Sequence, residues 1–213
     1  MEINEKEIIR YLGYGKVTPD EQTMVLIKEC MEKVQEVMTP RYVYRRFECT
    51  LLEDGVIETA GVRFQSRQLS HNLQGCEELL FFAATLGNGV DLLMNQYSRL
   101  SISRAAILQA VGAAAMEDYC NLCQQKIADK MRNENKFLRP RFSPGYGDFS
   151  LDFQQDFLRI IESSKTVGIY LSDGGVMIPE KSVTAIIGVS GENRHCVMEG
   201  CEACSNTTCS YRR

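Results

Sequence analysis

The chain has 213 residues and a formal net charge of −4 at pH 7, with 44% hydrophobic and 24% charged residues. This composition supports a buried core and excludes a disordered or fibrous protein, and the acidic balance argues against a general nucleic-acid binder. The charged residues 1–7 are unlike a secretory signal, and no apolar run approaches the length of a membrane span. We therefore expect a cytoplasmic protein without nucleic-acid or membrane partners.

The first strong helical signal follows Thr18. This threonine, Pro19 and the two acids after it predict a capped helix start, and apolar residues then recur at helical spacing as far as Met38, just before Pro40. The apolar stripe is typical of a helix that faces a core. The segments predicted next are strands over 41–52 and 56–64, a polar and less ordered stretch over 65–75, and a buried strand over 79–84.

Two helices are predicted in the middle of the chain. One begins at Asn88 or Gly89 and continues through Tyr97, and a longer one covers 101–131, where many alanines permit close packing. The segments predicted after it are a polar linker over 133–136, a loop over 139–148, a helix capped by Ser150, and two strands joined near 173–175. This order predicts an α+β fold, with a helical N-terminal half around a twisted, mixed or antiparallel sheet.

The most informative run is Arg141-Phe-Ser-Pro-Gly-Tyr146, which reads R-x-x-x-G-Y. Arg141 offers a planar fork that can hold a carboxylate through two parallel hydrogen bonds. Pro144 stiffens the loop, Gly145 allows the backbone to approach a ligand, and Tyr146 supplies a ring face for an adenine or a cation. S-adenosylmethionine carries a carboxylate, a cation and an adenine, so it suits such a loop.

The loop resembles the adenosylmethionine-binding motif of the activation domain of cobalamin-dependent methionine synthase. The similarity runs from near the N-terminus to about Gly188 and depends on an ordered set of segments. Besides the loop, these are Ala-Thr-Leu-Gly at 84–87, a glycine-led strand at 167–172, Met-Ile-Pro at 177–179 and a Ser-Val strand at 181–188. The resemblance implies the twisted α+β fold of that domain, here in a free-standing form.

The resemblance also implies a role for individual residues. Arg141, Gly145 and Tyr146 would contact S-adenosylmethionine beside Pro144, and Glu117 is the candidate for a helical glutamate that the family uses. In that family, the sulfonium methyl and one electron convert inactive cob(II)alamin to methylcobalamin. Neither histidine of this chain lies in the Asp-x-His-x-x-Gly pattern of cobalamin ligation. The cobalamin is therefore expected on a partner, a methionine synthase or another corrinoid protein, with a flavodoxin- or ferredoxin-type electron donor.

A second strong signal is a cluster of four cysteines near the C-terminus, spaced C-x4-C-x2-C-x4-C: Cys196, Cys201, Cys204 and Cys209. In a reducing compartment such clustering indicates a metal rather than disulfides. The spacing fits an iron–sulfur cluster, which would serve an electron-dependent reaction, and it fits a zinc site with four cysteine ligands equally well. The other five cysteines are scattered and predicted to be buried apolar residues, although Cys120 and Cys123 lie one helical turn apart.

We therefore predict an activation-like domain over 1–190 and a cysteine-rich tail over 191–213, which act as an S-adenosylmethionine-binding subunit of a methyltransferase system. Two alternatives remain open. One is a corrinoid-protein adaptor without S-adenosylmethionine chemistry, because a tyrosine that the family uses near its C-terminal end has no clear match here. The other is an iron–sulfur electron carrier or corrinoid reductase, in which the tail cysteines would hold the cluster.

Overall fold

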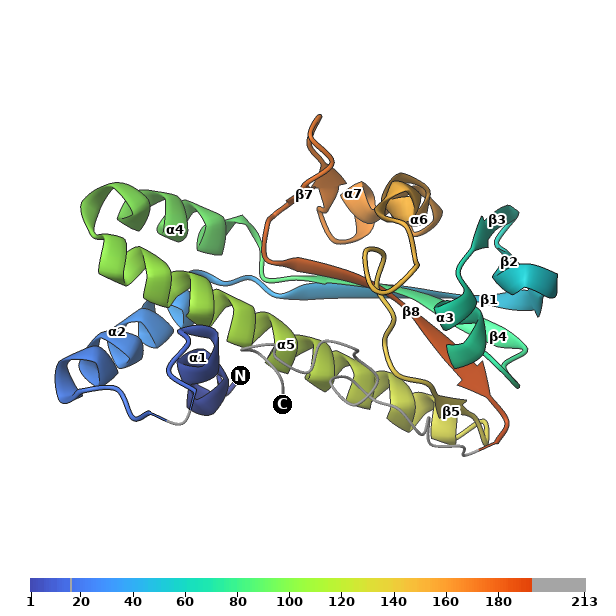
Figure 1. Cartoon of the computed structure of the whole chain (residues 1–213), viewed down its shortest axis with the longest axis horizontal. Helices are drawn as coiled ribbons and strands as arrows, with labels where there is room; N and C mark the ends of the chain where they lie inside the picture. The colour runs from blue at the N-terminus through green and yellow to red at the C-terminus, as the bar shows by residue number, and fades with distance from the viewer. Residues whose placement is uncertain (16, 193–213) are drawn as a thin grey trace.

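The computed structural model of the chain describes residues 1–15 and 17–192. Six strands form one twisted sheet, and every neighbouring pair in it is antiparallel (Figure 1). The predicted α+β fold is confirmed. In spatial order the strands are β3 (Val62–Gln65), β2 (Val56–Thr59), β1 (Arg41–Leu51), β4 (Glu78–Thr85), β8 (Ser182–Ser190) and β5 (Phe137–Leu138).

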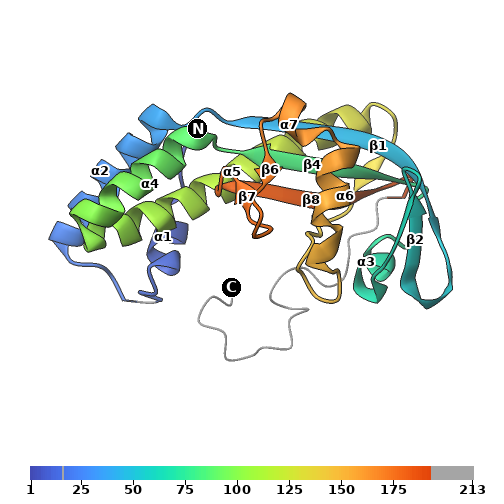
Figure 2. The same ribbon diagram turned by 90° about the horizontal axis from the view of Figure 1, so that it is seen from above.

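Helices cover both faces of this sheet (Figure 2). The helices on one face pack on the larger hydrophobic core and are α1 (Glu5–Tyr11), α2 (Glu21–Val37), α4 (Asn88–Leu100) and α5 (Ile102–Arg132). The elements on the other face pack over a second core rich in phenylalanine and are α3 (Arg67–Asn72), η2 (Leu151–Phe153), α6 (Gln154–Ile160) and α7 (Ser163–Thr166). A separate two-stranded hairpin of β6 (Tyr170–Leu171) and β7 (Met177–Ile178) adjoins this second layer.

Strand β4 shows how the sequence builds two cores on one sheet. Successive side chains of a strand point to opposite faces, so an apolar run without polar alternation must be buried on both sides. The even-numbered residues from Leu80 to Ala84 lie in the larger core, and the odd-numbered residues from Leu79 to Ala83 lie in the second core. The buried strand predicted over 79–84 is therefore confirmed, and it contributes to both cores.

The start of α2 differs from the prediction. Asp20, not Thr18, is the N-cap: its Oδ1 accepts a hydrogen bond from the backbone N–H of Thr23 at 2.8 Å. Pro19 is buried ahead of the helix and does not occupy its first turn. A carboxylate two residues further along thus satisfies the open N–H groups that Thr18 was expected to satisfy. The short helix α1 was not predicted.

Two predictions between β1 and β4 were also wrong. The segment 56–64 is not one strand but the hairpin β2–β3, because Ala60 and Gly61 turn the chain with φ angles of 51° and 74°. The stretch 65–75 is not irregular throughout, because it contains α3, whose N-cap Ser66 accepts a hydrogen bond from Leu69 N–H at 3.0 Å. An alanine in the left-handed region and a helix of only six residues both give weak sequence signals.

The long helix agrees with its prediction. Ser101 is its N-cap, and the helix ends at Arg132, one residue beyond the expected end. Its alanine-rich middle packs in the larger core, while charged and amide side chains line its other side. None of the helices in residues 1–15 and 17–192 combines the length and the apolar character that a membrane crossing requires.

Candidate functional site

Residues 137–142 run along β8 and carry the chain into the R-x-x-x-G-Y loop. Leu138 pairs with Val189, the Arg139 N–H donates to the carbonyl of Gly188 at 2.8 Å, and Phe142 exchanges two 2.9 Å hydrogen bonds with Ile186. Neighbouring side chains of an extended segment point to opposite faces. Phe142 is consequently buried in the second core, and the side chain before it lies against α5 on the first face.

That side chain belongs to Arg141, and three residues of α5 hold it. Its Nη1 donates to Oε1 of Gln124 at 2.7 Å, and its Nη2 donates to Oδ1 of Asn121 at 2.9 Å. Nη2 also forms an ion pair with Oε2 of Glu117 at 3.3 Å. The three partners are spaced four and three residues apart, so they share one face of the helix. The structure therefore brings the predicted site residues Arg141 and Glu117 into contact.

The Arg141–Glu117 pair is accessible to a ligand. The Arg141 side chain is 19% exposed and that of Glu117 is 39% exposed, so solvent reaches both. A guanidinium has five N–H donors, and the bonds to α5 use three of them. A cation and an anion side by side suit a zwitterionic group, whose carboxylate would bind Arg141 and whose ammonium would bind Glu117.

The loop that follows is a tight turn that exposes a tyrosine. The Gly145 N–H donates to the carbonyl of Phe149 at 2.7 Å, and the Tyr146 N–H donates to the carbonyl of Ser143 at 3.0 Å. Pro144 is buried, whereas Tyr146 is 50% exposed. The Tyr146 ring stands edge-on to a buried aromatic ring of the second core, with 5.4 Å between centroids. One edge of the tyrosine is thus supported by the core, and the ring remains available to a ligand.

Asp148 anchors the far end of the loop to α3. Its carboxylate accepts hydrogen bonds from the Ser66 hydroxyl and from the backbone N–H groups of Arg67, at 2.8 Å, and Gln68, at 3.2 Å. Partial burial opposes ionisation, but these donors still hold the pKa of Asp148 below its ordinary value. The R-x-x-x-G-Y loop is therefore fixed at both ends, by Arg141 on α5 and by Asp148 on α3.

A hollow of about 210 Å³ adjoins the loop on the face of the second core. Ser143 and Pro144 form one side, and Leu151, Gln154 and Met177 contribute to the rest. Its wall is mostly apolar with a few polar groups, which is the usual character of a small-molecule site. The loop thus has the ion pair on one side of the sheet and this hollow on the other.

With this geometry established, the chain was compared with known proteins. No protein-family model matches it, and no curated protein is similar to it in sequence. A similar solved structure is the crystal structure of the MetH reactivation domain bound to AdoHcy, with a TM-score of 0.61 and 13% identity. This chain shares the fold of the MetH reactivation domain. The match covers 92% of this chain and 79% of the MetH reactivation domain chain, so it takes in both helical layers.

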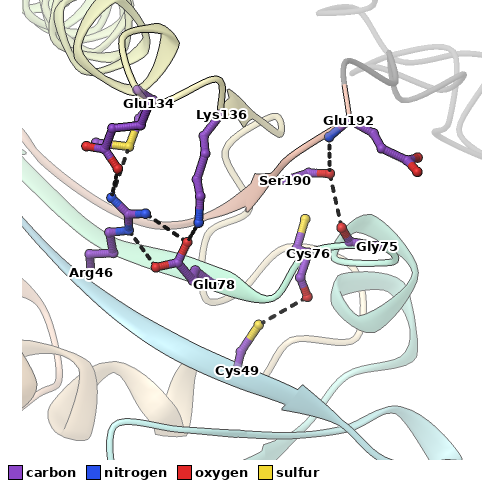
Figure 3. Close-up of polar contacts among 10 residues, drawn as sticks. Arg46, Cys49, Gly75, Cys76, Glu78, Glu134, Lys136, Ser190 and Glu192 are labelled. Carbon is purple, nitrogen blue, oxygen red and sulfur yellow. Dashed lines mark hydrogen bonds and ion pairs between the residues drawn. The ribbon is translucent and has the colours of Figure 1, made fainter.

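Four of the five cysteines within the described residues are buried, and Cys49 is half-buried. Burial raises the pKa of Cys120 to about 12 and that of Cys49 to about 11, which disfavours the reactive thiolate. Cys49 lies near the C-terminal end of β1, where its Sγ contacts the carbonyl of Cys76 at 3.7 Å (Figure 3). No group of three histidine, cysteine or acidic residues in 1–15 and 17–192 could hold a metal ion. The predicted metal ligands Cys196, Cys201, Cys204 and Cys209 lie outside the described residues.

Sequence reasoning missed part of this site. Asn121 and Gln124 complete the cradle of Arg141, and their spacing from Glu117 on a predicted helix was a signal that could have found them. Asp148 was expected only as the end of the loop over 139–148, and no local signal connects it with Ser66, which is 82 residues away in the chain. Pro144, Gly145 and Tyr146 lie on the loop as predicted, and their contact with a ligand stays a prediction.

Proposed function

We propose that this chain binds S-adenosylmethionine at the R-x-x-x-G-Y loop and presents it to a corrinoid carried by a partner protein. The observation that carries the proposal is the contact between Arg141 and Glu117 at one end of that loop. The fold supports it, because the similar MetH reactivation domain was solved with AdoHcy bound. The partner would be a cobalamin-dependent methionine synthase or a related corrinoid protein, and this chain would be a free-standing activation subunit.

The residues at the loop would act by positioning the ligand. Arg141 would bind the carboxylate of the methionine end and Glu117 its ammonium, while the Tyr146 ring would face the adenine or the sulfonium. The sulfonium methyl, together with one electron from a donor, would pass to the cobalt of the partner's cob(II)alamin, and AdoHcy would remain. No residue of this chain needs to act as a nucleophile or a base, because orientation is its contribution.

A second function has one observation in its favour. Arg141 already has three acceptors on α5, so the loop is stable without a ligand carboxylate. In an adaptor that contacts a corrinoid protein and binds no S-adenosylmethionine, these hydrogen bonds would serve only to fix the loop to α5. The two functions differ in one measurable property, which is the affinity of the isolated chain for S-adenosylmethionine.

Calorimetry under anaerobic conditions tests the proposal. We expect S-adenosylmethionine and AdoHcy to bind the unmodified chain saturably, and Arg141→Ala to weaken binding at least about tenfold, since a charged bidentate contact is lost. Arg159→Ala is the matched control, because that arginine is 71% exposed and pairs with Asp156 within α6. The affinity of Arg159→Ala for S-adenosylmethionine should equal that of the unmodified chain.

A second variant separates ligand binding from folding. Glu117→Gln keeps an acceptor for Arg141 but removes the negative charge. It should therefore weaken the binding of S-adenosylmethionine without changing the thermal unfolding midpoint by more than a few degrees. If the unmodified chain releases no heat with either ligand, the adaptor function replaces the proposal. If binding survives in both Arg141→Ala and Glu117→Gln, the ligand lies elsewhere on the fold.

A further inference from the structure

Helices α4 and α5 fold back on each other (Figure 1). Residues of both helices line a groove of about 310 Å³. Its apolar lining comes from Met94 of α4 and from Ala105 and Ala106 of α5, and Asn95 and Ser98 of α4 add polar groups. Its volume is in the range of small-molecule sites. The groove involves residues of α5 that precede the Arg141 contact: from Gln109 to Glu117 is about 12 Å along the helix.

One end of the groove is negatively charged. Asp91 on the first turn of α4 accepts a hydrogen bond at Oδ2 from the backbone N–H of Glu180 at 2.7 Å, and both residues line the groove. Asp91 Oδ1 is buried and has no hydrogen-bond partner among the described residues. A buried carboxylate oxygen without a donor favours a nearby positive charge. Glu180 is exposed, so its carboxylate can reach a cation directly.

One cation of the protein already lies near this end. The Lys181 ammonium donates to Oε1 of Gln109 at 2.7 Å, and its aliphatic stem packs against Gly112 of α5. The charged groups that face this end are thus two carboxylates, of Asp91 and Glu180, and one ammonium. The two carboxylates outnumber the one ammonium, and Lys181 is bonded to Gln109, a residue that lines the groove.

The opposite end of the groove is apolar and exposed. Ile102 forms the first turn of α5 and is 85% exposed, and it lines the groove together with the alanines. A β-branched aliphatic side chain at this exposure gains free energy from any apolar group that covers it. Across its length the groove therefore changes from an aliphatic surface to a carboxylate pair.

We propose that this groove binds an aliphatic stem that ends in a primary ammonium or a guanidinium group. The stem would cover Ile102, Ala105 and Ala106, and the cationic head would lie at Asp91 and Glu180. A free alkylamine and a lysine or arginine side chain of a partner protein share this chemistry. The site is separate from the R-x-x-x-G-Y loop and does not depend on the function proposed for that loop.

Amide chemical-shift titration of the ¹⁵N-labelled full chain tests the proposal, with n-pentylamine as the probe at pH 7. Saturable shifts should concentrate on α4 and the first turns of α5, and n-pentanol and pentanoate should give weaker or no shifts. Glu180→Gln should lower the affinity for n-pentylamine about threefold to fivefold, as expected for the loss of one exposed ion pair. Ala106→Leu, which fills the groove with a good helix former, should abolish the shifts.

The controls separate this site from other causes. Glu53→Gln removes an exposed carboxylate beyond the far end of β1 and should leave the n-pentylamine affinity unchanged, as should Arg141→Ala. A short acetylated and amidated Ala-Lys-Ala peptide, titrated in parallel, identifies the source: saturable shifts with the peptide indicate a partner's side chain, and shifts with n-pentylamine alone indicate a free amine. Shifts that do not saturate, or an affinity equal in Glu180→Gln and the unmodified chain, would overturn the proposal.

Discussion

Gly145 of the R-x-x-x-G-Y loop has a backbone conformation that disfavours substitution. Its φ is +87°, and a Cβ built there would lie 2.9 Å from Cδ2 of Leu151. Leu151 is exposed and can move, but the left-handed backbone conformation costs a non-glycine residue about 1–2 kcal/mol. We expect Gly145→Ala to lower the thermal unfolding midpoint by about 2–8 °C and to weaken AdoHcy binding in calorimetry.

Gly174→Ala is the control for this prediction. Gly174 lies in the turn between β6 and β7, and a Cβ there would meet only the Ser172 hydroxyl at 3.9 Å, an ordinary contact. Neither the unfolding midpoint nor the AdoHcy affinity should change. The result that would contradict the argument is a Gly145→Ala chain with unaltered stability and affinity, since it would show that the loop adopts another backbone conformation at no cost.

Among the elements, those with long apolar periodicity could be predicted from the sequence. The helix α5 and the strands β1 and β4 carry local signals over many residues, and each was predicted within a few residues of its bounds. The hairpin β2–β3 and the helix α3 could not be predicted in the same way. The hairpin turn begins at Ala60, a residue that rarely adopts a positive φ, and α3 depends on Asp148, which only the folded chain brings to its N-terminus.

The same distinction holds for the site. Arg141 and Glu117 could be chosen from residue chemistry and a family resemblance, but their contact depends on the register of residues 137–142 along β8. A shift of that register by one residue would exchange the faces and place Phe142 against α5. Pairing across 24 positions is therefore a property of the assembled sheet and not of any local motif.

An ion network connects the end of α5 to the sheet. Glu78 at the start of β4 binds Arg46 of β1 through two 2.8 Å contacts and also binds Lys136, while Arg46 reaches Glu134 at 2.6 Å (Figure 3). Hydrogen bonds from Arg46, and then from Lys136, lower the pKa of Glu78 to about 2. The side chain of Glu78 is only 19% exposed, so solvent screens the network partially.

This network gives a pH dependence of stability. The pKa of Glu78 is lower in the folded chain than its ordinary 4.5. The ionised carboxylate therefore stabilises the folded chain above pH 4.5, and this stabilisation is lost as the pH falls toward about 2. We expect Glu78→Gln to reduce the free energy of unfolding by about 2 kcal/mol at pH 7, measured by urea denaturation. The difference between Glu78→Gln and the unmodified chain should shrink over that acidic range.

The control for the network is Glu134→Gln. Glu134 is 49% exposed and forms an ion pair with Arg46, one of the two cations that bind Glu78. Its substitution should therefore reduce the free energy of unfolding clearly less than that of Glu78 does. Equal effects of the two substitutions at pH 7 would contradict the assignment of Glu78 as the centre of the network. So would a Glu78→Gln effect that stays constant between pH 7 and the acidic range.

On the scale of the whole molecule, the residues that form both cores within 1–15 and 17–192 extend as far as Val189. Beyond them, the Ser190 hydroxyl donates to the carbonyl of Gly75 at 3.0 Å and accepts from the Glu192 N–H at 3.1 Å (Figure 3). We propose that residues 1–190 and 191–213 are separate units, and we expect a chain that ends after Glu192 to fold and to bind S-adenosylmethionine with unchanged affinity. Circular dichroism melting and calorimetry on both chains provide the measurement, and a large fall in the melting midpoint would contradict the division.

The shortened chain also decides what the four tail cysteines do. If Cys196, Cys201, Cys204 and Cys209 hold a metal, anaerobically purified full-length protein should contain iron or zinc by elemental analysis, and the chain ending after Glu192 should contain neither. Cys49→Ser is the control, because Cys49 contacts the protein backbone and should not affect the metal. Iron with a broad visible absorbance that a reductant bleaches would give the subunit its own route for the electron. Zinc would assign the tail a structural role and leave electron delivery to an external donor, and a metal-free protein would refute the site.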